Sequence, residues 1–417
     1  MDRKFFTSIA TLVSGTAFAQ LASLLFVPWI TRLYGPDAFG GLGYFSALLS
    51  FLTPLAALSY PLALVLPKRD SEARGLLELS FLLAFVATFL LVCVFYALAY
   101  LTPSLFPFSY AAVLVPLAVA LSVAIAAYTQ WAIRDGHFRL VATVTLLTAL
   151  LGGAGKVALG YVMPNTMALI LVTCAVLLIN LWVLVKNVAA EPRLSRLTLH
   201  RKKYVALAQK YLRFPFFRMP HALLALVSQM APIFLLTSFF GAKYAGFFVL
   251  TRTVLAAPVS LIGKAVYDVS YPKIAKRHNA KQANFYFITK LTLVLVGLSI
   301  VPLVIIFAAG ELLFAWAFGS EWGTAGVYAA WMSLWFTFNF SNKAIAAAVS
   351  VYSLDAFLFI NGLLNAVLSL GGFLIGAFAF ASDVAAVALF SLFSIVCQVL
   401  LIAKVLRVVK HADAQLT

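Results

Sequence analysis

Long apolar segments, bounded by charged residues, glycine or proline, recur along the whole 417-residue chain. A helix that crosses a bilayer needs about 20 mainly apolar residues, because its backbone must satisfy its own hydrogen bonds there. Twelve segments meet this requirement, at residues 6–31, 40–66, 76–101, 110–132, 140–161, 166–185, 216–239, 245–270, 285–309, 325–350, 356–380 and 383–404. The sequence therefore predicts an all-α polytopic membrane protein with short loops.

Composition supports this class and excludes others. The chain is 64% hydrophobic and 10% charged, whereas a soluble domain carries about 25% charged residues. The start imitates a cleavable signal peptide, but its apolar run continues to Ile30, so we expect a retained first helix. The 3 cysteines and 5 histidines are scattered without metal-ligand spacing. We therefore expect no metal, no cofactor and no enzymatic activity.

The distribution of basic residues predicts the orientation. Most of the 30 lysines and arginines lie at the two ends of the chain and in the loops after the even-numbered spans. Only Arg32 and Lys243 lie in loops on the other side, where Asp37, Glu311 and Asp383 are found. Basic loops stay on the cytoplasmic side, so both termini are predicted to be cytoplasmic. The net charge of +17 is then mainly a topology signal, and we expect no nucleic-acid partner.

A polar segment near the middle of the chain divides it into two halves, residues 1–190 and 214–417. Within residues 191–213, apolar side chains follow helical spacing between many basic ones. The apolar set is Tyr204, Leu207, Ala208, Tyr211 and Leu212. We interpret the segment as a basic amphipathic helix on the inner leaflet. Its role is a linker between the halves or, alternatively, a regulatory or lipid-recruiting element.

The two halves share a sequence pattern. Tyr34-Gly35 and Phe39-Gly40 after the first span match Phe240-Gly241 and Ala245-Gly246 after the seventh. Leu105-Phe106 and Leu313-Phe314 recur at nearly the same offset, which is about half the chain length. Each half holds six spans, an even number, so both halves begin on the same side of the membrane. The duplication is therefore parallel, about an axis along the membrane normal. Two six-helix lobes related in this way are typical of transporters.

Several motifs carry a resemblance to a known family. Those at the start of the second half are Phe214-Pro215-Phe216-Phe217, Ser228-Gln229, Phe239-Phe240-Gly241, Ala245-Gly246, Arg252 and Pro258-Val259-Ser260-Leu261-Ile262-Gly263. Two others are Phe318-Gly319-Ser320-Glu321-Trp322 and Leu33-Tyr34-Gly35-Pro36-Asp37-Ala38-Phe39-Gly40. Together they resemble the polysaccharide and lipopolysaccharide flippases, the Wzx-type branch of the multidrug/oligosaccharidyl-lipid/polysaccharide exporter superfamily.

This resemblance implies a cargo and a mechanism. Two lobes surround a cavity that opens alternately to each side of the bacterial inner membrane. The implied cargo is an undecaprenyl-diphosphate-linked oligosaccharide used for O-antigen, capsule or exopolysaccharide assembly. Membrane lipids are further partners, and a polysaccharide polymerase and a chain-length regulator are expected ones. The chain has no GxxxxGK[ST] motif and few intramembrane carboxylates, so transport is expected to use the membrane potential or an ion gradient.

Cations inside the predicted spans are the candidate cargo-binding residues, because a charge near the bilayer centre needs a partner or a wet cavity. The candidates are Arg252, Arg218, Lys264 and Lys156, with Lys264 able to pair with Asp268 one turn away. For Arg218, Lys264, Lys290 and Lys343, snorkelling toward the cytoplasmic surface is the competing explanation. For Lys156, the nearby glycines favour close helix packing instead.

Two other groups of residues are candidates for the transport mechanism. Asn339 and Asn342, beside Ser341 in the tenth span, are either sugar contacts or hydrogen bonds between helices. Prolines inside spans are either fixed kinks or hinges for alternating access. The hinge candidates are Pro54, Pro61, Pro215, Pro220, Pro232 and Pro258.

Two other functions remain open at the level of sequence. A drug or cation antiporter of the same superfamily would favour carboxylates in the cavity, which are scarce here. A membrane-embedded glycan polymerase or ligase typically needs a sizeable outer loop, whereas the predicted outer loops are short.

The predicted orientation is tested with a reporter fusion. Alkaline phosphatase fused after Arg201 should be inactive, because the enzyme works only outside the cytoplasm. High activity of this fusion would overturn the orientation and with it the proposed direction of transport.

Overall fold

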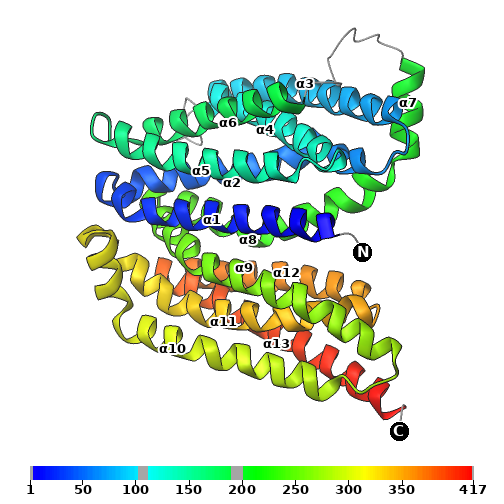
Figure 1. Cartoon of the computed structure of the whole chain (residues 1–417). Coiled ribbons are helices and arrows are strands. Elements are labelled where there is room, and N and C mark those ends of the chain that lie inside the picture. The colour runs from blue at the N-terminus through cyan, green and yellow to red at the C-terminus, as the bar shows by residue number, and fades with distance from the viewer. Residues whose placement is uncertain (1–2, 102–110, 189–200, 416–417) are drawn as a thin grey trace. The chain divides into compact units, whose positions relative to one another are not determined.

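A computed structural model describes residues 3–101, 111–188 and 201–415, and these residues form helices and no strand (Figure 1). The long helices are α1 (Arg3–Leu33), α2 (Pro36–Ala56), α3 (Asp70–Leu101), α4 (Ala111–Arg134), α5 (Phe138–Gly160), α6 (Thr166–Val188), α8 (Met219–Phe239), α9 (Ala242–Asn279), α10 (Phe285–Phe318), α11 (Gly323–Val351), α12 (Asp355–Ala379) and α13 (Asp383–Ala414). Among the described residues, eleven helices are long and apolar enough to cross a membrane. The prediction of an all-α polytopic membrane protein is confirmed.

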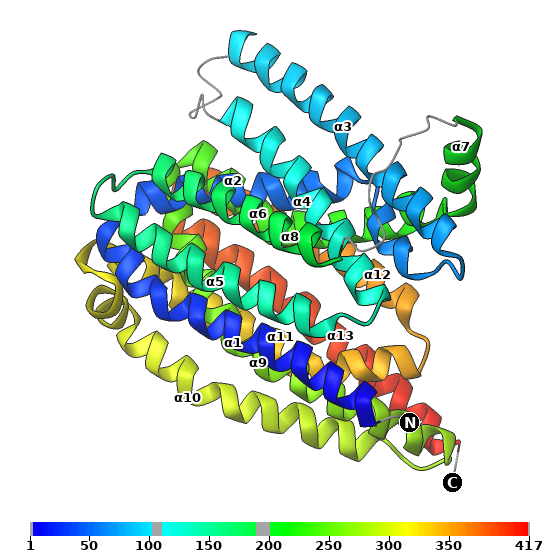
Figure 2. The same ribbon diagram turned by 45° about the horizontal axis from the view of Figure 1, so that its top comes forward.

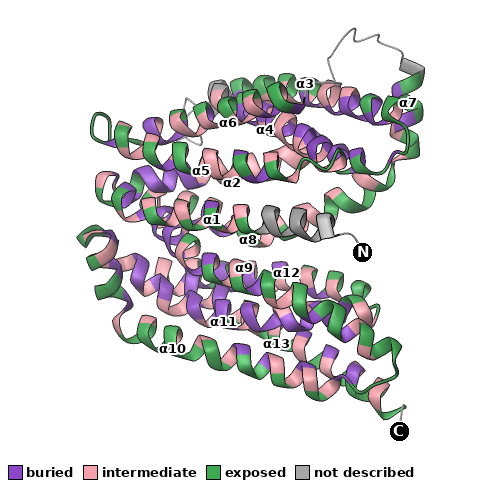
Figure 3. Cartoon of the chain, viewed as in Figure 1, coloured by how far each residue is buried: buried purple, intermediate pink, exposed green. Residues whose placement is uncertain are grey.

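The helix outside those eleven is α11, which matches the predicted span at 325–350. It has 29 residues, which gives about 43 Å at 1.5 Å per residue, so its length is sufficient. Its composition is less apolar because it packs against protein, where alanine, serine and asparagine are tolerated. Figure 3 shows how much of α11 is buried among its neighbours α9, α10 and α13.

The predicted second span, 40–66, is wrong in its second part. α2 ends at Ala56, Leu58 and Ser59 adopt left-handed backbone angles, and a short 3₁₀ helix, η1, runs from Tyr60 to Val65. Pro61 disfavours a continuous α-helix here because it lacks an N–H and its ring clashes with the carbonyl one turn earlier. Pro61 therefore lies in the first turn of η1 and not inside a membrane helix.

The other hinge candidates divide into two sets. Pro215 lies in a π-helical turn, η3 (Phe214–Arg218), and Pro220 lies in the first turn of α8. At the start of a helix a missing N–H removes no hydrogen bond, so Pro220 causes no break. Pro54, Pro232 and Pro258 lie inside α2, α8 and α9. Only these three have the position that a hinge inside a membrane helix requires.

The described residues form two compact units. The first contains residues up to 34 and residues 41–226, and the second contains residues 35–40 and 227 onward. In the first unit α1 packs along α5, and α3 lies beside α4 in both views (Figure 2). Small residues allow the α1–α5 contact, because a Cβ on Gly153 would meet the Phe26 ring at 2.1 Å. Close helix packing is thus the role of this glycine.

The connector helix α7 (Arg201–Lys210) packs on protein with part of its predicted apolar face. Tyr204 and Leu207 are buried in the core of the first unit, beside η1 and the start of α3. Gly75 of α3 makes room for Leu207, whose Cδ1 would lie 2.5 Å from an added Cβ. Leu212 is exposed, so part of the predicted apolar set faces outward.

Two lysine–tyrosine pairs hold α7 on α3. Lys203 and Tyr204 both donate to Glu78 Oε2, at 2.9 and 3.1 Å. One heptad later, Lys210 and Tyr211 both donate to Glu72 Oε1, the tyrosine at 3.0 Å. The hydrogen bond to Glu72 raises the pKa of the Lys210 ammonium, so this lysine stays charged at neutral pH. Charge-assisted bonds of this kind are stronger than neutral ones.

The attachment of α7 to α3 through Glu72 and Glu78 is testable by hydrogen exchange. The double variant Glu72→Gln, Glu78→Gln keeps the size of both side chains but removes their charge. Backbone amides of α7 should then exchange at least about tenfold faster, because each carboxylate loses two charge-assisted bonds. Asp355→Asn, at an exposed acid in the first turn of α12, is the control and should leave α7 unchanged. Equal exchange in both variants would show that apolar packing alone holds α7.

The two copies of the repeated motif meet inside the second unit, which includes residues 35–40. A Cβ on Gly40 would lie 1.8 Å from the Ala242 carbonyl oxygen, and one on Gly246 would lie 2.0 Å from that of Pro36. Pro36 and Ala242 are equivalent positions in the repeat, as are Gly40 and Gly246. The contact between the two copies of the motif is therefore reciprocal. Only glycine permits backbones to approach this closely.

Alanine at either glycine of this crossing should be strongly destabilising. Gly40→Ala and Gly246→Ala should each lower the thermal midpoint of the purified protein by several degrees, because overpacking against backbone costs about 1–3 kcal/mol or more. Gly297→Ala, on α10 with no atom within 4 Å of the new methyl group, should have no such effect. Unchanged midpoints for the first two variants would contradict the crossing.

Candidate functional site

Arg252 lies in the third turn of α9 and faces α8. Its Nη2 donates to Gln229 Oε1 at 2.8 Å, and its Nη1 contacts Met230 Sδ at 3.4 Å. The side chain is half-buried, and no carboxylate of the described residues lies within ion-pair distance of it. A guanidinium has five N–H donors, so a neutral amide and a thioether leave most of its capacity unused. Arg252 can therefore accept an anion as a further, bidentate partner.

Lys343 is a second intramembrane cation in the same unit. Its aliphatic stem crosses α9 at Gly263, where an added Cβ would meet Lys343 Cγ at 2.8 Å. The side chain is half-buried, and within the described part of the chain its ammonium has no acidic partner. Gly263 lies three turns after Arg252, offset by about 20° around α9 and about 16 Å along it. Arg252 therefore lies near one end of α9, and Lys343 of α11 lies against the same side of α9 further along.

The remaining cationic candidates differ in exposure and position. Arg218, Lys264 and Lys290 are exposed. The predicted ion pair between Lys264 and Asp268 is wrong: the two side chains make no ion pair, and both are exposed. At i and i+4 on one helix a pair contributes only a few tenths of a kcal/mol, which does not hold two long side chains together.

Lys156 belongs to the first unit and lies near the end of α5. Its backbone carbonyl accepts a hydrogen bond from the buried Tyr34 hydroxyl at 2.8 Å. Gly160, one turn later, packs under the Tyr34 ring. The geometry around this lysine therefore joins the end of α1 to the end of α5. The structure does not bring Lys156 and Arg252 into one unit.

Two of the polar residues Asn339, Ser341 and Asn342 of α11 make hydrogen bonds to protein. Asn342 donates its side-chain amide to Gln398 of α13, and the Ser341 hydroxyl donates to the Thr337 carbonyl at 2.8 Å. Asn342 is buried, so its hydrogen bond joins two packed helices. Asn339 is half-buried, on the side of α11 that carries Lys343 one turn later. Of the two asparagines, Asn339 is the one placed to contact a ligand.

Carboxylates of the described residues serve mainly at helix ends. Asp70, Glu72 and Glu78 pair with cations at the start of α3. Asp413 near the end of α13 accepts the backbone N–H groups of Asn284 and Phe285, which caps the start of α10. Tyr328 donates to Asp383 at 2.7 Å. Groups of acidic, histidine and cysteine residues that could hold a metal ion do not occur in these residues.

Sequence reasoning marked Arg252 as a candidate cargo-binding residue but did not identify its hydrogen-bond partner Gln229. For Lys343, where snorkelling was the competing explanation, the sequence did not show that the stem lies across α9 at Gly263. Gln229 and Gly263 both lie in the motifs of the second half, yet their spacing gives no signal of these contacts. They arise from the packing of α8, α9 and α11.

The fold has well-defined relatives among solved structures. It matches the lipid II flippase MurJ in an inward closed conformation with a TM-score of 0.75 and 12% identity, covering 96% of this chain and 87% of that one. An inward-facing multidrug resistance MATE family transporter of the MOP superfamily matches with a TM-score of 0.55 and 13% identity, covering 97% and 95%. A MOP superfamily transporter from Pyrococcus furiosus gives 0.57 and 10%, covering 99% and 97%. This is the fold of MOP superfamily flippases and transporters.

Sequence comparison defines the family more closely. The model of the polysaccharide biosynthesis protein family matches residues 29–326, which is most of the chain. The protein therefore belongs to this family, as its motifs predicted. No curated protein sequence matches the chain significantly.

Proposed function

We propose that the protein is a flippase that moves undecaprenyl-diphosphate-linked oligosaccharides from the cytoplasmic to the periplasmic leaflet of the bacterial inner membrane. Its products serve surface polysaccharide assembly, and both termini are cytoplasmic. Membership of the polysaccharide biosynthesis family supports the cargo class, and the MOP superfamily fold supports a transporter. A polysaccharide polymerase and a chain-length regulator are the partners that would use the exported units.

The observation that carries the proposal is a half-buried arginine with neutral partners inside a membrane helix. Arg252 binds only Gln229 and Met230 among the described residues, so its charge is not neutralised by the protein. A diphosphate carries the opposite charge and presents oxygens that match a guanidinium bidentately. A cationic drug would instead be repelled by Arg252 and Lys343, which disfavours a drug antiporter.

Transport requires that the site first binds the diphosphate head group and then releases it. In a site partly shielded from water, the guanidinium interacts with the diphosphate more strongly than it would at the surface. Lys343, about 16 Å further along α9, offers a second charge toward the other membrane face. Asn339 supplies an amide for sugar hydroxyls. The lobes then open alternately, driven by the membrane potential or an ion gradient.

Substitution of Arg252 tests the proposal. Arg252→Ala should reduce surface polysaccharide roughly 10- to 100-fold, because a hydrogen bond to a charged group contributes about 1.5–3 kcal/mol. Arg252→Lys should restore part of the export, since it returns the charge without the bidentate geometry. Protein abundance in the membrane is measured in the same strains.

Lys290→Ala is the matched control, because Lys290 is an exposed cation on α10 and should be dispensable. A drop in abundance that parallels the drop in export would assign Arg252 a structural role through Gln229. Normal polysaccharide in a normally expressed Arg252→Ala strain would remove this residue from the site.

A further inference from the structure

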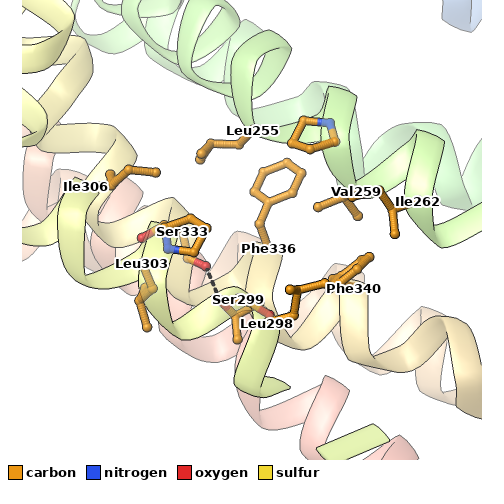
Figure 4. A pocket seen from close by; sticks show the side chains of 13 residues that line it. Leu255, Val259, Ile262, Leu298, Ser299, Leu303, Ile306, Ser333, Phe336 and Phe340 are labelled. Carbon is orange, nitrogen blue, oxygen red and sulfur yellow. Dashed lines mark hydrogen bonds between the residues drawn. The ribbon is translucent and has the colours of Figure 1, made fainter. Parts of the chain in front are cut away.

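An apolar groove of about 330 Å³ lies in the second unit between α9 and α10, with α11 as its floor. α9 and α10 both pack along α11 but hardly contact each other. Each carries a proline in the groove wall, Pro258 and Pro302, and Figure 4 shows Phe336 of α11 between side chains from the two helices. The groove is open at Ile262 and Leu298, which are 44% and 57% exposed.

The groove lies at mid-depth in all three helices. The residues that form it begin at least ten positions from either end of α9, α10 and α11. Ten residues of helix span about 15 Å, which is half of the roughly 30 Å hydrocarbon thickness of a bilayer. The groove therefore lies where hydrocarbon replaces water as the solvent.

The lining of the groove has no polar group free for a ligand. Its three hydroxyl groups each donate to a carbonyl of their own helix: Ser299 to Leu295 at 2.6 Å, Ser333 to Ala330 at 2.8 Å and Thr337 to Ser333 at 2.9 Å. The other lining side chains are apolar. Such a groove stays dry, and its walls lose dispersion contacts unless a hydrocarbon fills it.

We infer that this groove holds the first isoprene units of the carrier lipid, next to its diphosphate. Arg252 lies one turn before Leu255, the first α9 residue of the groove, so an anion held by Arg252 places the attached chain at the Leu255 end of the groove. An apolar cavity of about 150 Å³ accommodates a benzene ring, so this groove has room for roughly two five-carbon units. This inference rests on the proposed function.

The head group and the groove act together in this arrangement. Membrane lipid tails are as apolar as the groove, so burial alone gives no preference for one chain over another. An anion bound at Arg252 tethers its own chain beside the groove and raises its local concentration above that of bulk lipid. The rings of Phe336, Phe340 and the two prolines then favour a methyl-branched chain by shape.

Photolabelling tests the inference on the full-length protein in lipid nanodiscs. The probe is a polyprenyl phosphate with a diazirine on its second isoprene unit, and labelled peptides are identified by mass spectrometry. Labels should fall on the groove residues of α9, α10 and α11. Unlabelled undecaprenyl phosphate should compete with the probe, and excess phosphatidylglycerol should not. A phospholipid with a diazirine on its acyl chain should not label the groove selectively.

Ser299→Phe fills the groove and should reduce labelling at least tenfold, whereas Gly297→Phe places the same ring in open space on α10 and should not. Leu298→Trp, at the exposed rim, repeats the test if Ser299→Phe is poorly expressed. Equal labelling in Ser299→Phe and Gly297→Phe, or labelling by the phospholipid probe that polyprenyl phosphate does not displace, would overturn the inference.

The failure of this inference is distinguishable from that of the proposed function. Polysaccharide export that depends on Arg252 together with labels outside the groove would overturn only the groove. Absence of any saturable polyprenyl labelling in the wild-type protein, with Arg252→Ala exporting normally, would overturn both.

Discussion

Backbone hydrogen bonding inside hydrocarbon is the constraint on which this structure depends. Each N–H and C=O at membrane depth needs a partner within the chain, and helices provide it locally. Departures from regular helix lie between or at the ends of long helices at Leu58 and Ser59 before η1 and in the π turn before α8. One further departure lies inside α10, at Ala309. The kink at Ala309 adjoins Gly310, where α10 meets the backbone of α11 at Gly326.

Within a bilayer, helices associate through close packing and not through the hydrophobic effect, so small residues decide which helices meet. Gly153 receives the Phe26 ring in the first unit, and Gly40 and Gly246 bring the backbones of two related helix starts together in the second. The central helix α11 follows the same logic, because its many alanines and serines let α9, α10 and α13 approach it. A duplicated sequence thereby forms a reciprocal contact at its repeated glycines.

Charged side chains have different partners at the ends and in the middle of the helices. At the start of α3, Glu72 and Glu78 each receive a lysine and a tyrosine, which fastens α7 to the first unit. In the second unit Arg252 and Lys343 have no carboxylate partner among the described residues. The first arrangement is structural, and the second leaves charge available to an anion. The apolar groove beside Arg252 adds a place for the hydrocarbon chain that such an anion carries.

The sequence by itself determined the helical membrane class, nearly all of the spans, the repeat and the family, because hydropathy, glycine position and motifs are local properties. It also marked Arg252, since a charge deep in an apolar run is visible without any partner. Tertiary structure decided the rest. That α7 packs on α3, that Arg252 contacts Gln229, and that Lys343 crosses Gly263 all depend on side chains from different helices. Their proximity follows from how the helices pack, which no local pattern along the chain records.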